Sequence, residues 1–322
     1  MARFTFNLPD IGEGIAEAEI VAMHVKPGDR VATFAWNHYQ HVELYYAIPG
    51  IGAVCHTLNI RLSADQLIYI INHALDEIIF LDTTLVPLME KIAPYATGVK
   101  QYIVMNAPAG FQCSLPDVLY YEDLLREEEE TFECAGVSEN DACALCYTSG
   151  TTGNPKGALY SHRSTVLHAY AAALPDVMNL SARDSVLPVV PMFHVNAWGI
   201  PYSAALTGCK LVFPGPALDG KSVYDLLESE KVTFAAGVPT VWQMLLGHMQ
   251  ANGLRFSTLN RTVIGGSACP PAMINAFNDD YGIDVLHAWG MTEMSPLGTL
   301  CTLKNKHLLL SKEEQMKIRL KQ

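Results

Sequence analysis

The sequence predicts an α/β fold in which mainly parallel sheets are flanked by helices. Short apolar, strand-like runs alternate with stretches whose apolar residues recur at helical spacing, from residue 31 onward and again from Ala142 through Val285. Glycine turns follow some of these runs. With 322 residues, half of them apolar, the chain can form one large domain or two ordinary ones with a sizeable core.

The first part of the alternation can be followed element by element. We expect a strand at 31–36, a helix at 41–52, a strand at 54–58, a helix at 63–72 and a strand at 78–81. The acidic run 127–130 predicts a solvated loop or helix face. Near the other end, Ser311 and Glu314 have the spacing of a capping box, which predicts the start of a charged helix.

Charge and hydropathy exclude two classes of partner. The formal net charge is -12, with 21 Lys and Arg against 33 Asp and Glu, so a nucleic acid would meet an unfavourable field. A local phosphate site remains open, because backbone amides can bind phosphate whatever the net charge. No apolar run reaches the roughly 18 residues of a membrane span, so the sequence predicts a soluble protein.

The eight cysteines are spread from Cys55 to Cys301. One close pair, Cys143 and Cys146, has the C-x-x-C spacing of redox and zinc sites. It lies in the apolar run 142–147, without a second pair of ligands, which favours two core residues on a buried strand. Dispersed cysteines predict a reducing, cytoplasmic location.

The most informative segment is 147–157, Tyr-Thr-Ser-Gly-Thr-Thr-Gly-Asn-Pro-Lys-Gly, between strand-like runs at 142–147 and 158–160. Its glycines permit a tight turn close to a ligand. Its hydroxyls and amides can bind phosphate oxygens, and Lys156 adds a cation, so a triphosphate fits. The residues that we expect to contact it are Thr148, Ser149, Gly150, Thr151, Thr152 and Gly153. The spacing differs from that of the Walker loop, and the segment is too long for a chance match to an ordinary turn.

This segment resembles the signature loop of the AMP-forming, adenylate-producing superfamily, which includes acyl-CoA synthetases, luciferases and peptide-synthetase adenylation domains. The resemblance implies the large N-terminal domain of an adenylate-forming enzyme, from about residue 28 to residue 322. It implies that residues 148–156 grip the β- and γ-phosphates of ATP.

The segment 191–198, Pro-Met-Phe-His-Val-Asn-Ala-Trp, resembles the lining of the acyl pocket in medium- and long-chain fatty acyl-CoA synthetases. The resemblance implies that Trp198 gates the acyl tunnel and that His194 lies near the carboxylate. Taken alone, both residues would be read as packed core. The segment favours fatty or related aliphatic acids over the substrates of luciferases and peptide synthetases.

Two further motifs agree in order and identity. The turn Gly265, Gly266, Ser267 and Ala268 follows a strand-like run, a common ligand position in α/β sheets, and the resemblance assigns it to adenine. Taken alone, the same residues fit a plain strand-to-helix turn equally well. In residues 287–293 the resemblance implies that Trp289 stacks on adenine, with Gly290 beside it in the nucleotide site. It also implies that Thr292 contacts the α-phosphate and that Glu293 binds Mg²⁺. The family commonly has Gly-Tyr-Gly where this chain has Ala-Trp-Gly, which keeps an aromatic residue.

The implied reaction joins a carboxylic acid to coenzyme A with ATP and Mg²⁺. Positioning and charge neutralisation carry most of the adenylation step, and Lys156, Thr292, Glu293 and His194 are the residues implied to act in it. The small-molecule partners are therefore a fatty or related acid, ATP and CoA. The resemblance leaves a homodimer open.

Several family features are missing after Glu293: the aspartate that binds ribose, the hinge, and the small C-terminal domain with its catalytic lysine. We therefore expect a truncated synthetase that binds ATP weakly and does not complete thioester formation. An alternative is a pseudo-enzyme remnant that only binds nucleotide.

Residues 1–31 resemble the start of a lipoyl domain from a 2-oxo acid dehydrogenase acyltransferase, through Leu-Pro-Asp-Ile-Gly-Glu-Gly and a later Pro-Gly-Asp turn. The lysine-bearing hairpin tip of that family is absent, so lipoyl function is not carried over. The shared segment 28–31 marks the expected seam. A lipoyl carrier or complex-assembly protein is the remaining alternative.

Overall fold

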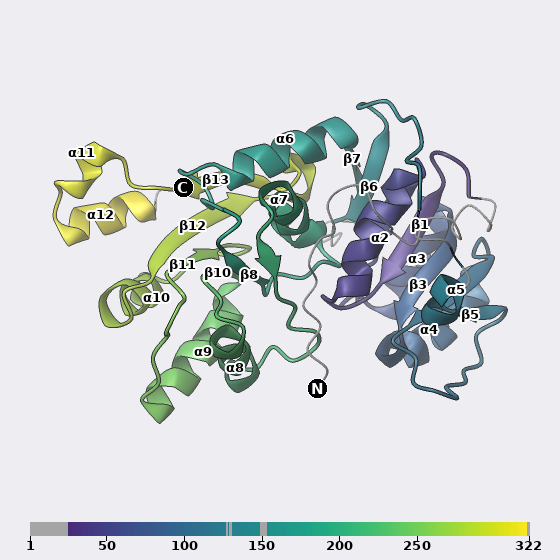
Figure 1. The fold of residues 1–322 in the computed structure, drawn as a ribbon, viewed down its shortest axis with the longest axis horizontal. Coiled ribbons are helices and arrows are strands. Elements are labelled where there is room, and N and C mark those ends of the chain that lie inside the picture. The colour runs from purple at the N-terminus through teal and green to yellow at the C-terminus, as the bar shows by residue number, and fades with distance from the viewer. Residues whose placement is uncertain (1–24, 127, 129–130, 149–152, 321–322) are drawn as a thin grey trace. The chain divides into compact units, whose positions relative to one another are not determined.

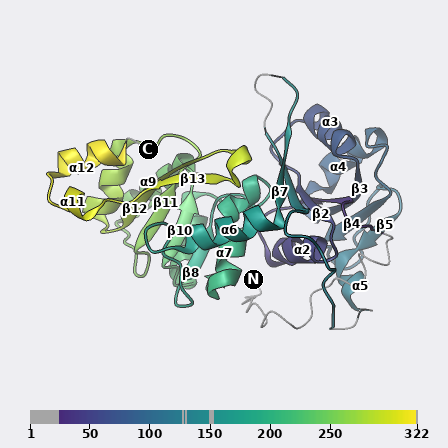
Figure 2. The same cartoon turned by 90° about the horizontal axis from the view of Figure 1, so that it is seen from above.

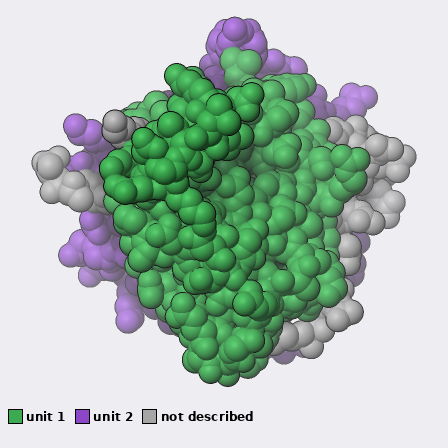
Figure 3. All heavy atoms as spheres, turned by 90° about the vertical axis from the view of Figure 1, so that its left-hand side faces the viewer, with its two compact units in different colours: residues 1–7, 166–191, 197–322 green, residues 8–165, 192–196 purple. Residues whose placement is uncertain are grey.

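The computed structural model describes residues 25–126, 128, 131–148 and 153–320. The chain divides into two compact units, which Figure 3 colours green and purple. Unit 1 contains residues 1–7, 166–191 and 197–322, and unit 2 contains residues 8–165 and 192–196. Each has its own sheet, so the predicted α/β class with mainly parallel sheets is confirmed.

In the described part of unit 2, the sheet has seven strands in the order β5-β4-β3-β1-β2-β6-β7 (Figure 1). All neighbours are parallel except β6 and β7. The strands are β1 Arg30–Phe34, β2 Val54–Thr57, β3 Asp76–Asp82, β4 Gln101–Met105, β5 Val118–Tyr120, β6 Ala142–Tyr147 and β7 Gly157–Ser161. The antiparallel pair can be joined by a tight hairpin, whereas each parallel pair needs a crossover.

Helices cover both faces of this sheet, with α3 and α4 on one face and α2 and α5 on the other (Figure 2). Their bounds are α2 Tyr39–Gly50, α3 Ala64–Ala74, α4 Val86–Ile92 and α5 Tyr121–Arg126. Gln40 Nε2 donates to Glu122 Oε1 at 2.6 Å, and the Tyr121 hydroxyl donates to Glu43 at 2.7 Å, which ties α2 to α5.

The predicted elements of this unit are present, with small shifts at their ends. The helix predicted at 41–52 begins two residues earlier, because the His38 ring caps it by accepting from the His41 amide at 3.3 Å. Ser63 caps α3 and forms a capping box with Gln66, so this helix begins where its sequence predicts. In the acidic run 127–130, residues 127, 129 and 130 lie outside the described residues.

In the described part of unit 1, six strands follow the order β13-β12-β11-β10-β8-β9, parallel except for β12 and β13. The strands are β8 Ser185–Pro188, β9 Lys210–Leu211, β10 Phe234–Gly237, β11 Arg261–Ile264, β12 Asp284–Gly290 and β13 Leu297–Cys301. The carboxyl ends of the parallel strands share one edge, where ligands commonly bind in open α/β sheets.

The helices of unit 1 also lie on both faces of its sheet. Helices α8, α9 and α10 pack on one face through a core that includes Trp242, Leu245 and Phe277, while α6 and α7 lie on the other (Figure 1). The bounds are α6 His162–Ala173, whose first four residues belong to unit 2, α7 Ile200–Thr207, α8 Gly220–Ser229, α9 Pro239–Asn252, α10 Pro271–Asn275, α11 Asn305–Leu308 and α12 Lys312–Arg319. The predicted capping box at the start of α12 is confirmed, with Ser311 accepting from the Glu314 amide.

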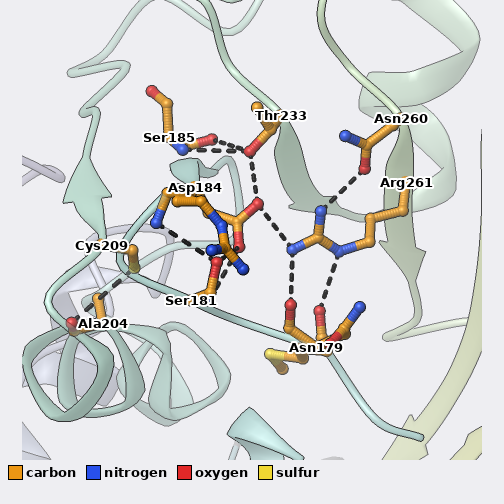
Figure 4. Close-up of polar contacts among 11 residues, drawn as sticks. Asn179, Ser181, Asp184, Ser185, Ala204, Cys209, Thr233, Asn260 and Arg261 are labelled. Carbon is orange, nitrogen blue, oxygen red and sulfur yellow. Dashed lines mark hydrogen bonds and ion pairs between the residues drawn. The ribbon is translucent and has the colours of Figure 1, made fainter. Parts of the chain in front are cut away.

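A polar cluster ties the amino ends of β8 and β11 together (Figure 4). The Arg261 guanidinium pairs with Asp184 at 2.9 Å and donates to the carbonyl of Asn179, also at 2.9 Å. Asp184 accepts from the Thr233 hydroxyl at 2.7 Å. Burial alone would raise the pKa of Asp184, but the hydrogen bonds from Thr233 and Arg261 lower it below its ordinary value. The cluster is structural, at the edge opposite the carboxyl ends.

The C-x-x-C pair lies on β6 as predicted. Cys143 and Cys146 are buried and free, and burial is the largest cause of their raised pKa values. The described residues contain no group of three or more His, Cys, Asp or Glu side chains that could hold a metal ion. The pair is therefore part of the core, which confirms the structural reading.

Candidate functional site

The predicted phosphate loop connects β6 to β7 at the carboxyl end of β6. Its base is closed by two hydrogen bonds: the Thr148 amide donates to the Lys156 carbonyl at 2.9 Å, and the Lys156 amide donates to Thr148 Oγ1 at 3.2 Å. The Lys156 side chain is exposed. Gly153 has a φ of +154° with open space around it. Four predicted contacts, Ser149, Gly150, Thr151 and Thr152, lie outside the described residues.

Tyr147, the last residue of β6, supports the base of this loop. Its hydroxyl lies 2.7 Å from His73 Nδ1. Its ring packs against Gly157, the first residue of β7, where a β-carbon would stand 3.2 Å from Tyr147 Cζ. Burial, followed by the charge of Asp76, raises the pKa of Tyr147 to about 12, so the phenol keeps its proton and can donate to His73. This support was not predicted, because His73 is 74 residues away in the chain.

Residues 192–196 of the predicted acyl segment 191–198 belong to unit 2 and are anchored there. The Met192 amide donates to Asn37 Oδ1 at 2.7 Å, and the Cys146 thiol donates to Asn196 Oδ1 at 3.3 Å. Burial, followed by the charge of Arg61, lowers the pKa of His194. A neutral imidazole can still donate an N–H to a carboxylate. The sequence did not indicate the nearby cation, the Arg61 guanidinium, which lies 5.6 Å from the centre of the Phe193 ring.

The backbone of residues 195–199 is left-handed throughout. The φ angles are 44° at Val195, 50° at Asn196, 47° at Ala197, 58° at Trp198 and 75° at Gly199. Each non-glycine residue in this conformation costs about 1–2 kcal/mol. Strain of this kind concentrates at binding and catalytic sites, where the surroundings hold it in place. This turn could not be predicted from the sequence, since only Gly199 favours a left-handed backbone.

In unit 1, Trp198 lies on the predicted adenine turn. The turn follows β11 directly, and Gly266 has a φ of +78°. A β-carbon on Gly265 would stand 3.2 Å from Trp198 Cη2, and one on Gly266 would stand 3.8 Å from Cζ2. Ser267 and Ala268 are exposed beyond this contact. The residue predicted to gate the acyl tunnel and the turn predicted to hold adenine are therefore neighbours.

The end of the turn is tied to β12 by His287. The Cys269 amide donates to His287 Nε2 at 3.2 Å, which leaves Nδ1 to donate to the Arg319 carbonyl at 3.1 Å. Sequence reasoning included His287 in a motif without giving it a role. The two bonds assign Nε2 as the acceptor and Nδ1 as the donor of this ring.

The remaining predicted residues follow β12 along the same edge. Trp289 is 48% exposed, so a face of its indole is open to a ligand. The next residues form a 3-10 turn, Thr292–Met294, in which Thr292 is buried and Glu293 is exposed. One exposed carboxylate fits Mg²⁺, which keeps several waters and takes its other ligands from a substrate's phosphates.

The site residues are thus divided between the units. Thr148, Gly153, Lys156 and His194 belong to unit 2, while Trp198, the 265–268 turn and residues 289–293 belong to unit 1. In each unit, the loop or turn lies at the carboxyl edge of the parallel sheet. No helix among the described residues is long and apolar enough to cross a bilayer.

Comparison with known proteins places this arrangement in a family. The family model "AMP-binding enzyme" matches residues 18–316. A medium-chain fatty-acid–CoA ligase of Ectopseudomonas oleovorans is 54% identical over 300 residues, which cover 92% of this chain and 55% of the relative. A long-chain fatty-acid–CoA ligase of Thermus thermophilus is 47% identical, over 93% of this chain and 54% of the relative. The chain spans about half the length of these relatives.

Solved structures agree on the fold. An anthranilate CoA ligase, AuaEII, in complex with anthranoyl-AMP superposes with a TM-score of 0.79 at 24% identity, over 87% of this chain and 53% of that one. A long-chain fatty-acid–CoA ligase, FadD1, from Archaeoglobus fulgidus gives 0.77 at 23% identity, over 89% and 56%.

The family match begins at residue 18, inside the segment 1–31. None of the matches gives support to the lipoyl resemblance, and residues 1–24 lie outside the described residues. The boundaries proposed at 28–31 stay predictions. Because the family model covers most of the chain, from before β1 to within α12, the chain belongs to the AMP-binding enzyme family.

Proposed function

We propose that this chain carries the ATP- and carboxylate-binding part of an acyl-CoA ligase that activates a medium- or long-chain aliphatic acid. One observation carries the proposal: a glycine- and hydroxyl-rich hairpin at the carboxyl end of a parallel strand, with its base closed between Thr148 and Lys156 and the Lys156 ammonium exposed. Such a hairpin suits a polyphosphate, because amides, hydroxyls and a cation converge on one anion.

The reaction has two steps. A carboxylate oxygen attacks the α-phosphorus of ATP, the bond to the pyrophosphate oxygen breaks, and an acyl-adenylate forms. The thiolate of coenzyme A then attacks the acyl carbon, and AMP leaves with the bonding electrons. The protein contributes position and charge compensation rather than covalent chemistry.

Each predicted residue has a role in the first step. Thr148, Gly153 and Lys156, together with residues 149–152, would hold the β- and γ-phosphates, and Thr292 would hold the α-phosphate. Trp289 and the 265–268 turn would seat adenine, and Gly290, where a β-carbon would meet the Pro296 backbone, would let the chain beside Trp289 approach the nucleotide. Glu293 would hold Mg²⁺, which offsets phosphate charge when bound. His194 would donate an N–H to the carboxylate, and Trp198 would contact the acyl chain.

Pyrophosphate exchange tests the proposal. Labelled pyrophosphate should enter ATP only when a fatty acid is present, and a series of acids from butyrate to palmitate should give a maximum at medium or long chains. Thioester formation with CoA is measured in parallel, to separate adenylation from the second step. Exchange that ignores the acid would contradict the proposal, and tight ATP binding with no exchange would support the pseudo-enzyme alternative instead.

Location and assembly are part of the same proposal. The free cysteines support a reducing cytoplasm, since all eight lack a disulfide. A homodimer is the assembly that the family resemblance leaves open, and sedimentation velocity would distinguish it from a monomer.

A further inference from the structure

His168, on α6, has contacts that none of the predicted roles uses. Its Nε2 accepts from the Leu297 amide at 3.2 Å. On its other side, a β-carbon on Gly199 would stand 2.6 Å from Nδ1 and 2.8 Å from Cε1, so the imidazole lies directly on the Gly199 backbone. All three residues belong to unit 1. One side chain therefore touches two segments that are about 100 residues apart.

Leu297 closes the loop that carries Thr292 and Glu293. The loop leaves β12 at Gly290 and returns at Leu297, which pairs with Gly290 in the sheet. At its base, the Met291 amide donates to the Pro296 carbonyl at 3.0 Å. The bond from Leu297 to His168 thus fixes the return side of the loop.

Gly199 ends the left-handed turn that carries Trp198. The turn holds four non-glycine residues in a conformation that their side chains disfavour, so it depends on its surroundings. The imidazole against Gly199 is such a support, and it leaves no room for any side chain at that position. Trp198, the adjacent residue, contacts Gly265 and Gly266.

The protonation state of His168 matches this arrangement. Burial lowers its pKa to about 4, so the ring is neutral near pH 7 and Nε2 can accept. The donor is a backbone amide, which cannot turn away, so the contact fixes the orientation of the ring as well as the position of Leu297.

We infer that His168 is a positioning residue for the adenylation step. On the ATP side it acts through Leu297 on the Thr292–Glu293 loop, and on the acid side it acts through Gly199 on Trp198. The inference rests on the proposed function. No substrate contact is assigned to His168, so its role is distinct from those of the residues assigned to ATP and to the acid.

The test compares two substitutions in the full chain. His168→Leu keeps bulk against Gly199 but removes the acceptor, whereas His168→Gln can return an acceptor to the Leu297 amide. His248→Leu, on α9 of the same unit, is the matched control for loss of a helical histidine. Calorimetric titrations with MgATP and, separately, with decanoate measure the affinity for each substrate. Hydrogen exchange of the Leu297 amide measures the protection given by the hydrogen bond itself.

We expect His168→Leu to weaken the MgATP affinity about tenfold, the factor that corresponds to one buried hydrogen bond, and the decanoate affinity less, because leucine still packs on Gly199. His168→Gln should recover most of the ATP affinity and the protection of the Leu297 amide, and His248→Leu should bind as wild type. If His168→Leu does not fold, His168→Asn, which is too short to reach Leu297, takes its place. A lowered melting temperature with both affinities unchanged would overturn the inference. Wild type that fails to bind ATP would instead overturn the proposed function, and the inference with it.

Discussion

The indole of Trp198 and the backbone of Gly265 are in contact, close enough that a β-carbon on the glycine would stand 3.2 Å from Cη2 of the ring. The same β-carbon would stand 2.8 Å from the Ala288 carbonyl oxygen, which is backbone and cannot move alone. Glycine at this position therefore lets the turn predicted to hold adenine and the tryptophan predicted to contact the acyl chain lie together within unit 1. A ligand bound against the 265–268 turn and a ligand bound against Trp198 would therefore both depend on this contact.

Gly265→Ala should consequently harm both stability and binding. Overpacking against Ala288 and Trp198 is expected to lower the free energy of unfolding by about 1–3 kcal/mol and the ATP affinity by tenfold or more. Gly247→Ala is the matched control, because Gly247 lies in α9 with open space around it. It should raise stability by about 0.5–1 kcal/mol. Urea unfolding and calorimetric titration measure the two effects, and unchanged ATP binding in Gly265→Ala would contradict the assignment of the turn.

Acid should destabilise the chain through two buried histidines before the carboxylates protonate. Burial lowers the pKa of His168 to about 4, and burial, followed by the charge of His38, lowers that of His41 to about 3. The unfolded chain takes up these protons near pH 6.5 and the native state does not, so this stability is complete above pH 6.5 and is lost as the pH falls toward 4.

Between pH 7 and pH 5, each histidine should account for about 2 kcal/mol of the loss in unfolding free energy. His168→Gln should reduce the loss by that amount, while Leu167→Ala, at an exposed position on the same helix, should leave it as in wild type. Urea unfolding at the two pH values makes the comparison. An equal loss in His168→Gln and wild type would show that this histidine is not buried in its neutral form.

The Arg261–Asp184 pair should be worth far more than an exposed pair. Arg261→Met leaves the partly buried Asp184 carboxylate without its cation and is expected to lower the free energy of unfolding by about 1.5–3 kcal/mol. Adding Asp184→Asn should recover part of this cost, because the uncompensated charge is removed. Lys221→Met, which breaks the exposed pair with Asp225, should change stability by less than about 1 kcal/mol. Equal effects of Arg261→Met and Lys221→Met would refute the structural role of the cluster.

Local signals in the sequence predicted much of the fold. Ser63 and Ser311 mark helix starts through side chains three residues away, and the apolar run 142–147 forms a buried strand as predicted. The positions of the phosphate loop and of the 265–268 turn follow from the strands before them. These features depend on neighbours in the chain, which is why pattern alone sufficed.

The supports of the site could not be predicted in this way. His168 meets Leu297 across 129 residues, and Tyr147 meets His73 across 74, so no spacing rule links them. The left-handed turn at 195–199 contradicts the local preferences of Val195 and Trp198 and is held by tertiary contacts. In physical terms, the sequence predicted candidate binding residues and left open what holds them in place.

Equilibrium binding of MgATP to Lys156→Met tests the central claim most directly. Lys100→Met is the control, since Lys100 is an exposed lysine of the same unit, paired with Glu77 at 2.9 Å. Loss of a charge-assisted contact to phosphate should lower the ATP affinity of Lys156→Met by roughly ten- to a hundredfold, while Lys100→Met should bind as wild type. Equal ATP affinity in Lys156→Met and Lys100→Met would contradict the account, because the hairpin between β6 and β7 would then not be the site that holds the phosphates.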